Sequence, residues 1–205
     1  MVHVKGSDKV INQAETLLPT EWGEFVLSAF TDNQGDPMPH LSMRHPEMDI
    51  SQPVVTRVHS ECLTGDIFHS LKCDCGEQLT ASMNIINKHQ GILIYLRQEG
   101  RGIGIINKIK AYRHQEKGLD TIEANEALGL EAEYRDFKVA ARILNSFGIK
   151  QIRLLTNNPF KVNNLSENGI DVVDRLPLII EPNKANKSYL ETKAKSMGHL
   201  LNINH

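Results

Sequence analysis

The chain has 205 residues, of which 40% are hydrophobic and 23% are charged, and its formal net charge is −2. These values are typical of a globular protein, and we expect one domain over residues 1–205 with a flexible extension at residues 1–13. The small net charge predicts no general attraction to nucleic acid or to anionic membranes. The sequence contains neither a signal-peptide core nor the roughly 20 apolar residues of a membrane-spanning helix, so we expect a cytoplasmic protein.

The first sixty residues contain short β-like runs that are separated by turn residues. We predict strands over Glu24–Phe30 and Val54–His59, with a break at residues 33–37 that contains Gly35 and Pro37. This half of the chain is therefore predicted to be mostly strand.

From Cys75 onward the pattern changes to an alternation of strands and helices. Apolar periodicity and glycine stops predict strands over Gly91–Leu96, Gln151–Leu155 and Ile170–Val173, and helices over Ile105–Lys117, Phe137–Phe147, Pro159–Asn168 and Ser188–Leu201. Such alternation predicts an α/β fold. We expect a layered mixed sheet with an N-terminal mostly-β half and a C-terminal βα-alternating half. The second of these helices should bury one face, formed by Phe137, Ala140, Ala141, Leu144 and Phe147.

Three cysteines, Cys62, Cys73 and Cys75, lie close together in the sequence. An odd number cannot all pair within one chain, so metal binding fits better than a disulfide framework. Because structural zinc sites usually have four protein ligands, three cysteines favour a catalytic zinc site with one position open for water. Two alternatives stay open: a structural Cys3His site completed by His59 or His69, and three unrelated buried cysteines.

The strand before Cys62 alternates in a way that places Arg57, His59 and Glu61 on one face. That face would bring a cation, an imidazole and a carboxylate beside the metal. Three thiolates make a bound water less acidic, so a nearby base is expected there. The alternative interpretation is that the same face belongs to an exposed edge strand.

A glycine-rich turn at residues 97–104 connects a predicted strand with a predicted helix. Free N–H groups and the positive end of the helix dipole make such a turn an anion site. The turn matches neither the dinucleotide fingerprint nor the P-loop. However, Arg97 and Arg101 suit phosphate, and Glu99 suits the donor edge of a guanine.

A second turn, after the strand Gln151–Leu155, carries Thr156 and Lys161, which could contact a phosphate chain. The alternative is simple helix capping with a solvated lysine. By default, Thr121 is a helix N-cap and Tyr112 is a core residue.

Eight motifs together make the chain resemble GTP cyclohydrolase II over nearly everything from Leu18 to Leu201. The most specific is RVHSECLTGD at residues 57–66. The others are KCDCG (72–76), RQEGRGIG (97–104), DTIEAN (120–125), YRD (134–136), LTNNP (155–159), YLETK (189–193) and MGHLL (197–201).

The resemblance implies that Cys62, Cys73 and Cys75 bind one Zn²⁺ per subunit. It also implies a homodimer that uses Mg²⁺ with the triphosphate of its substrate, GTP. The implied GTP contacts are Arg57, Val58, His59, Ser60, Glu61, Gln78, Glu99, Gly100, Arg101, Thr121, Thr156 and Lys161.

The implied reaction is zinc-dependent hydrolysis of GTP, in which the imidazole ring opens with release of formate and pyrophosphate. The product would be 2,5-diamino-6-(5-phosphoribosylamino)pyrimidin-4(3H)-one, in the first step of riboflavin biosynthesis. The alternatives are a paralogue that stops at the formamide or retains pyrophosphate, and a non-catalytic GTP-binding zinc protein.

The same resemblance places the family's nucleophilic arginine at Arg135 and its proton acceptor at Glu133, where the family usually has aspartate. Glutamate carries the same acid group on a longer stem, so we expect an active enzyme. A guanidinium with a pKa above about 12 has no free lone pair. Arg135 is therefore either a nucleophile that a carboxylate such as Glu133 deprotonates, or an electrostatic clamp.

Overall fold

The computed structural model describes residues 10–31, 36–130, 134–196 and 198–201. Its centre is a seven-stranded sheet with the strand order β1-β2-β3-β5-β4-β6-β7. The first three strands and β5 pair antiparallel, whereas β5, β4, β6 and β7 pair parallel. The strands are β1 (Ile11–Thr20), β2 (Gly23–Thr31), β3 (His40–Arg44), β4 (Val54–Ser60), β5 (Ile92–Leu96), β6 (Gln151–Leu155) and β7 (Asp171–Leu176).

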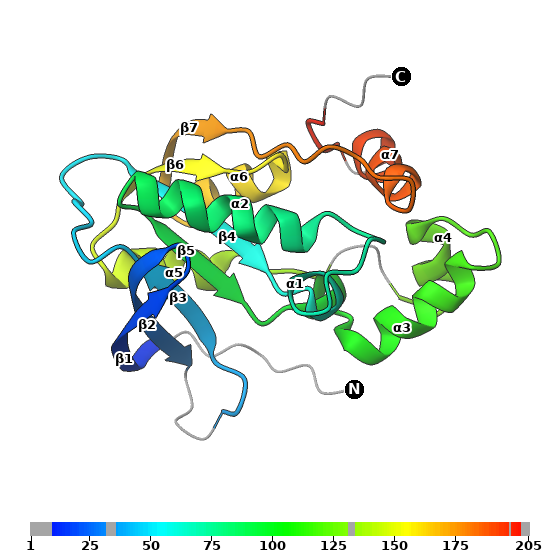
Figure 1. The fold of residues 1–205 in the computed structure, drawn as a ribbon, viewed down its shortest axis with the longest axis horizontal. Coiled ribbons are helices and arrows are strands. Elements are labelled where there is room, and N and C mark those ends of the chain that lie inside the picture. Colours follow the sequence, from blue (N-terminus) through cyan, green and yellow to red (C-terminus); the bar gives the residue numbers. More distant parts are fainter. Residues whose placement is uncertain (1–9, 32–35, 131–133, 197, 202–205) are drawn as a thin grey trace.

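Helices cover both faces of this sheet, and Figure 1 shows α2 across the front and α5 behind. The mixed sheet, with its β-rich first half and βα-alternating second half, confirms the predicted fold class. The helical elements are α1 (Leu63–Asp66), α2 (Cys75–Lys88), the 3-10 turn η1 (Glu99–Gly102), α3 (Gly104–Gln115), α4 (Thr121–Glu126), α5 (Lys138–Ser146), α6 (Pro159–Glu167) and α7 (Lys187–Ser196). None of the helices in the described ranges has both the length and the apolar character that a membrane span requires.

Two apolar clusters hold the layers together, one on each face of the sheet. On the α2 face, Met83 and Ile86 pack with strand residues such as Val55 and Leu93. On the other face, α5 and α6 pack against β4, β5 and β6. The predicted apolar face of α5 lies in this cluster, with Phe137, Ala140, Ala141 and Leu144 fully buried and Phe147 packed against it.

Prediction from the sequence missed or misplaced several segments, including the short strand β3, which it did not predict. Residues 11–13, expected in an N-terminal extension, belong to β1, which is an edge strand with few buried side chains and hence little hydrophobic pattern. Helix α2 was not predicted, because its first turn contains Cys75 and Gly76 rather than a capping motif. Helix α7 ends at Ser196, five residues before the predicted end, and Gly198 beyond it has a positive φ of 64°.

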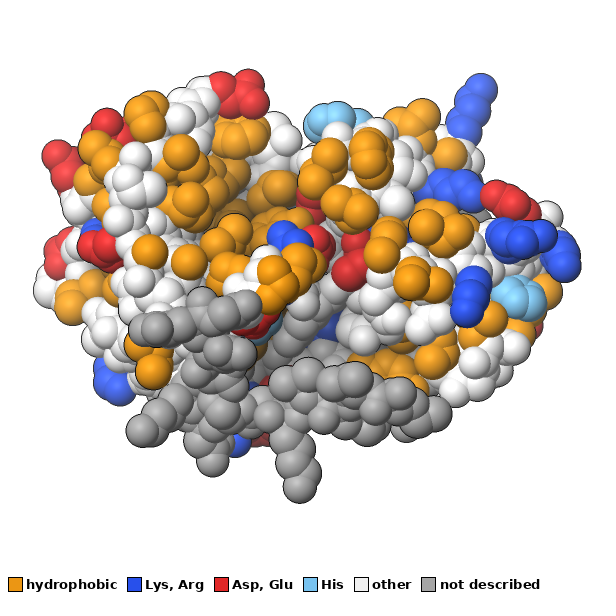
Figure 2. Space-filling view, turned by 90° about the horizontal axis from the view of Figure 1, so that it is seen from below, with side chains coloured by type: hydrophobic (Ala, Val, Ile, Leu, Met, Phe, Trp, Pro, Cys, Tyr) orange, Lys and Arg blue, Asp and Glu red, His pale blue; other side chains and the backbone are white. Residues whose placement is uncertain are grey.

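The carboxyl ends of the parallel strands β4, β5 and β6 meet at one edge of the sheet, where ligand sites of open α/β sheets form. Helices α3, α4 and α7 lie beyond this edge (Figure 1). Lys and Arg side chains gather at the end of the molecule formed by α3 and α4 (Figure 2).

Gly91 allows the close approach of the α2–β5 connection to strand β4. A Cβ atom at this position would collide with the backbone carbonyl of Val55, which cannot move without disturbing the sheet. We expect Gly91→Ala to lower the free energy of unfolding by about 1–3 kcal/mol, the usual cost of overpacking. Lys88→Ala, at the exposed end of α2, should change it by less than about 0.5 kcal/mol. Urea denaturation of both variants checks this, and equal stabilities would contradict it.

Candidate active site

A single pocket at the carboxyl edge of the sheet collects almost all of the predicted site residues. Of those named from the sequence, Val58 and Arg97 do not line it, and Glu133 lies outside the described residues. Arg97, predicted to suit phosphate, pairs with Glu61 at 3.2 Å instead. The Val58 side chain is in the core instead. The predicted residues that line the pocket are Arg57, His59, Ser60, Glu61, Cys62, Cys73, Cys75, Gln78, Glu99, Gly100, Arg101, Thr121, Arg135, Thr156 and Lys161.

The three cysteines form a compact group in which all sulfur atoms lie within 4.8 Å of one another. The sulfurs of Cys62 and Cys73 are 3.6 Å apart. Tetrahedral zinc with Zn–S bonds of about 2.3 Å would separate two sulfurs by about 3.8 Å, so this group fits zinc. Gly65 leaves room for it, since a Cβ atom there would lie 2.9 Å from the Cys73 sulfur and 3.1 Å from the Cys62 sulfur.

No histidine or carboxylate in the described part of the chain joins this sulfur group. His59 pairs with Asp66 instead, and His69 is exposed. The Cys3His alternative is therefore wrong for the described residues, and so is the alternative of three unrelated cysteines.

Lys108 and Glu99 lie beside the sulfur group. Lys108 Nζ is 3.0 Å from Cys62 Sγ and 2.8 Å from Glu99 Oε1. The second Glu99 oxygen accepts from the backbone N–H of Leu63 at 2.6 Å. Hydrogen bonds from the Cys73 and Cys75 thiols, and then the Lys108 ammonium, lower the pKa of Cys62. The sequence did not single out Lys108, although it lies one helical turn before Tyr112 in the predicted helix.

The predicted polar face of β4 is buried, because β4 lies between β5 and β6. The exposed-edge interpretation is therefore wrong. Arg57 is 6% exposed and donates to Leu155 O at 2.9 Å and to Gln78 Oε1 at 2.8 Å. Burial is the main cause that lowers the Arg57 pKa to about 10.

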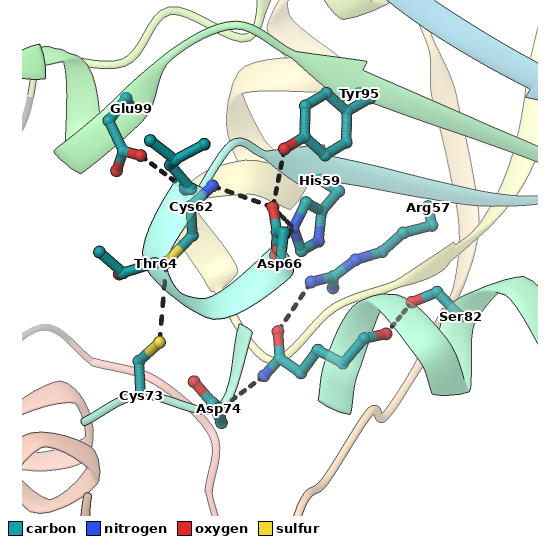
Figure 3. Close-up of polar contacts among 12 residues, drawn as sticks. Arg57, His59, Cys62, Thr64, Asp66, Cys73, Asp74, Ser82, Tyr95 and Glu99 are labelled. Atoms are coloured by element: carbon teal, nitrogen blue, oxygen red, sulfur yellow. Dashed lines mark hydrogen bonds and ion pairs between the residues drawn. The ribbon is translucent and has the colours of Figure 1, made fainter. Parts of the chain in front are cut away.

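Asp66 organises the other residues of this face (Figure 3). His59 Nε2 is 3.1 Å from both carboxylate oxygens of Asp66. The Tyr95 hydroxyl donates to Asp66 at 2.8 Å, and the backbone N–H of Cys62 donates at 3.0 Å. Burial lowers the pKa of His59 despite this carboxylate. Asp66 lies in the RVHSECLTGD motif, but its spacing alone does not reveal its partners.

The turn between β6 and α6 is more buried than simple capping requires. Asn158 is the N-cap and accepts from Phe160 N, while Thr156 Oγ1 accepts from Asn158 N at 3.1 Å. Lys161 is only 5% exposed and donates to Val58 O at 2.7 Å. The alternative of a solvated lysine is therefore wrong.

Two default interpretations from the sequence are corrected on the α3–α4 side. Asp120, rather than Thr121, is the N-cap of α4, and it forms a capping box with Glu123. Thr121 instead lines the pocket. Tyr112 lines the pocket as well, with its hydroxyl 3.4 Å from Thr64 Oγ1.

The C-terminal segment forms another wall of the pocket, through Tyr189, Lys193 and His199. The N–H of Leu200 donates to Asn157 O at 2.8 Å, which holds this segment beside the β6–α6 turn. Positive charge converges here. The pKa of His199 is lowered to about 3, first by burial and then by its cationic neighbours Lys193, Arg135, Lys161 and Arg101.

The family model for GTP cyclohydrolase II matches residues 11–177. A GTP cyclohydrolase-2 from Buchnera aphidicola subsp. Schizaphis graminum is 51% identical over 194 residues, which cover 94% of this chain and 98% of that protein. One from Neisseria meningitidis serogroup C is 49% identical over 95% of this chain and 98% of its own length. The riboflavin biosynthesis protein RibBA of Chlorobium phaeovibrioides is 50% identical over 94% of this chain and 47% of its own length. Because the family model matches most of the chain and relatives of about 50% identity match nearly all of it, this chain belongs to the GTP cyclohydrolase II family.

Proposed function

We propose that this protein is a zinc-dependent enzyme that hydrolyses GTP, opens its imidazole ring and releases formate and pyrophosphate. The observation that carries the proposal is that a three-thiolate group and a strongly cationic region share one pocket. Membership of the family and the names of its relatives support GTP as the substrate and riboflavin biosynthesis as the pathway.

Cys62, Cys73 and Cys75 would hold the zinc ion. Bound there, zinc would supply a Lewis acid that makes water more acidic and polarises the imidazole carbon under attack. Three thiolates carry more negative charge than the ion neutralises. The Lys108 ammonium, 3.0 Å from Cys62 Sγ, offsets part of this excess.

Glu99 is the proposed partner of the guanine base. An ionised carboxylate has about four acceptor positions, and Lys108 and the Leu63 N–H use one on each oxygen. The remaining positions suit the N1–H and 2-amino donors of guanine. Because Lys108 contacts both Glu99 and Cys62, the base would be held beside the metal ligands.

The cations around His199 are the proposed triphosphate site. Arg101 of η1, Lys161 of α6 and Arg135 of the segment before α5 all line the pocket. Their charge would stabilise the pyrophosphate as it leaves, together with Mg²⁺. We assign Arg135 an electrostatic role here, because a guanidinium among other cations has no lone pair to donate.

Several further properties are proposed from the family resemblance alone. They are the identity of the pyrimidine product, Mg²⁺ as the second cofactor, one zinc per subunit, a homodimer and a cytoplasmic location. Glu133 is proposed as the proton acceptor in pyrophosphate release. The direct GTP contacts of Val58 and Ser60 are proposed on the same basis.

The proposed reaction is tested by its product balance. Purified protein with Zn²⁺, Mg²⁺ and GTP should generate formate and pyrophosphate in equal amounts, as each ring opening is matched by one cleavage between the α and β phosphates. Formate dehydrogenase and pyrophosphatase assays measure the two products. Pyrophosphate without formate, formate without pyrophosphate, or neither product would contradict the proposal.

Cys73→Ser should remove or weaken zinc and abolish formate release, because a hydroxyl is a poor substitute for a thiolate ligand. His69→Asn is the matched control: His69 is exposed and has a positive φ of 50°, which asparagine tolerates. It should retain zinc and activity. Elemental analysis and formate assays check both variants. Full zinc content in Cys73→Ser would refute the metal assignment.

Glu99→Gln should reduce the preference for GTP over ITP, since ITP lacks the 2-amino group. The lost charge-assisted hydrogen bond predicts a fall of about tenfold or more in the GTP-to-ITP ratio of kcat/KM. Glu126→Gln, exposed on α4, should leave this ratio unchanged. If Glu99→Gln lowered activity equally with both nucleotides, Glu99 would have no role in reading the 2-amino group.

A further inference from the structure

A buried ion pair joins the C-terminal helix α7 to the turn that carries two of the three cysteines. Lys193 Nζ lies 2.9 Å from Asp74 Oδ1, and the two side chains are 11% and 2% exposed. Asp74 stands between Cys73 and Cys75 and is the N-cap of α2. Any movement of Asp74 would therefore displace both cysteines.

Asp74 is also the first link of a chain of hydrogen bonds into the sheet (Figure 3). Its second oxygen accepts from Gln78 Nε2 at 2.6 Å. Gln78 Oε1 in turn accepts from Arg57, which donates to Leu155 O. This series of hydrogen bonds connects α7, the cysteine turn, β4 and β6. The loss of one partner would therefore disturb the positions of the others.

When zinc binds and the two flanking cysteines become thiolates, Asp74 without Lys193 would be a buried carboxylate beside them. Like charges in a poorly solvated site repel strongly. Breaking a buried ion pair by removing one partner is correspondingly unfavourable. Movement of Asp74 toward water would relieve this repulsion. The sulfurs of Cys73 and Cys75 would then move away from Cys62, and the three would no longer lie within 4.8 Å of one another.

We propose that Lys193 is a positioning residue for the metal ligands: docking of α7 holds the Cys73–Cys75 turn in its metal-binding geometry. This rests on the proposed zinc site and gives α7 a role that the sequence did not predict. Because linkage is reciprocal, zinc bound at the turn must stabilise the docked α7 by the same factor. Tyr189 and Lys193 of α7 line the pocket, so the same docking also completes the pocket wall.

The first test is the zinc affinity of Lys193→Met, which removes the charge and keeps most of the side-chain length. Lys195→Met, exposed on the same helix, is the matched control. Competition with a chromophoric chelator should show zinc binding about 10- to 100-fold weaker in Lys193→Met, the scale for losing an outer partner of a metal site. Lys195→Met should match the unaltered protein within about twofold. Equal affinities in both variants would overturn the inference.

Hydrogen exchange at α7 measures the reciprocal effect without any catalysis. Zinc should slow amide exchange in residues 187–196 of the unaltered protein and of Lys195→Met, but not of Lys193→Met. Exchange that does not respond to zinc in the unaltered protein would overturn the inference. Failure of the unaltered protein to bind zinc would instead refute the proposed function.

Asp74→Asn provides a second route if Lys193→Met folds poorly, since it keeps the shape of the side chain and removes the opposite charge. If the ion pair carries the coupling, the double variant Asp74→Asn/Lys193→Met should weaken zinc binding no more than the worse single variant. Additive losses would show that the two residues act independently and would overturn the inference.

Discussion

The structure depends on the burial of two polar side chains, Arg57 and His59, on strand β4. The strand lies between two parallel neighbours, so Arg57 and His59 are almost completely buried, at 6% and 2% exposed. A buried polar group without partners is costly, and each of these therefore requires a specific acceptor. Those acceptors come from α1, α2 and β6, which fixes the position of these elements around the carboxyl end of β4.

This constraint also separates the charges of the pocket. Cysteine and carboxylate side chains gather where β4 and β5 end, with Lys108 between Cys62 and Glu99. Cations gather where β6 and the C-terminal segment meet, around His199. A ligand with an aromatic donor edge at one end and several negative charges at the other matches this arrangement. A nucleoside triphosphate has that distribution of charge.

The sequence predicted strands β4, β5 and β6 and the α5 face from local periodicity, and its motifs named the three cysteines and many, but not all, of the residues that line the pocket. It did not predict β1, whose exposed edge position leaves little pattern, or α2, which begins inside the cysteine turn. Prediction from the sequence did not identify Lys108 and Lys193 as site residues, because their contacts join segments that are far apart in the sequence. Lys193 and Asp74 are separated by 119 positions, and no local rule connects them.

The long separation in sequence between Asp74 and Lys193 has a consequence for biosynthesis. A chain emerges from the ribosome from its N-terminus, and early segments begin to fold before late ones are made. All three cysteines and the strands around them are therefore available well before Lys193. Until α7 emerges, Asp74 lacks the Lys193 ammonium with which it pairs. The proposed metal site would thus reach its final geometry only after α7 has been made, and a chain that lacks α7 would have the three cysteines without the Lys193–Asp74 ion pair.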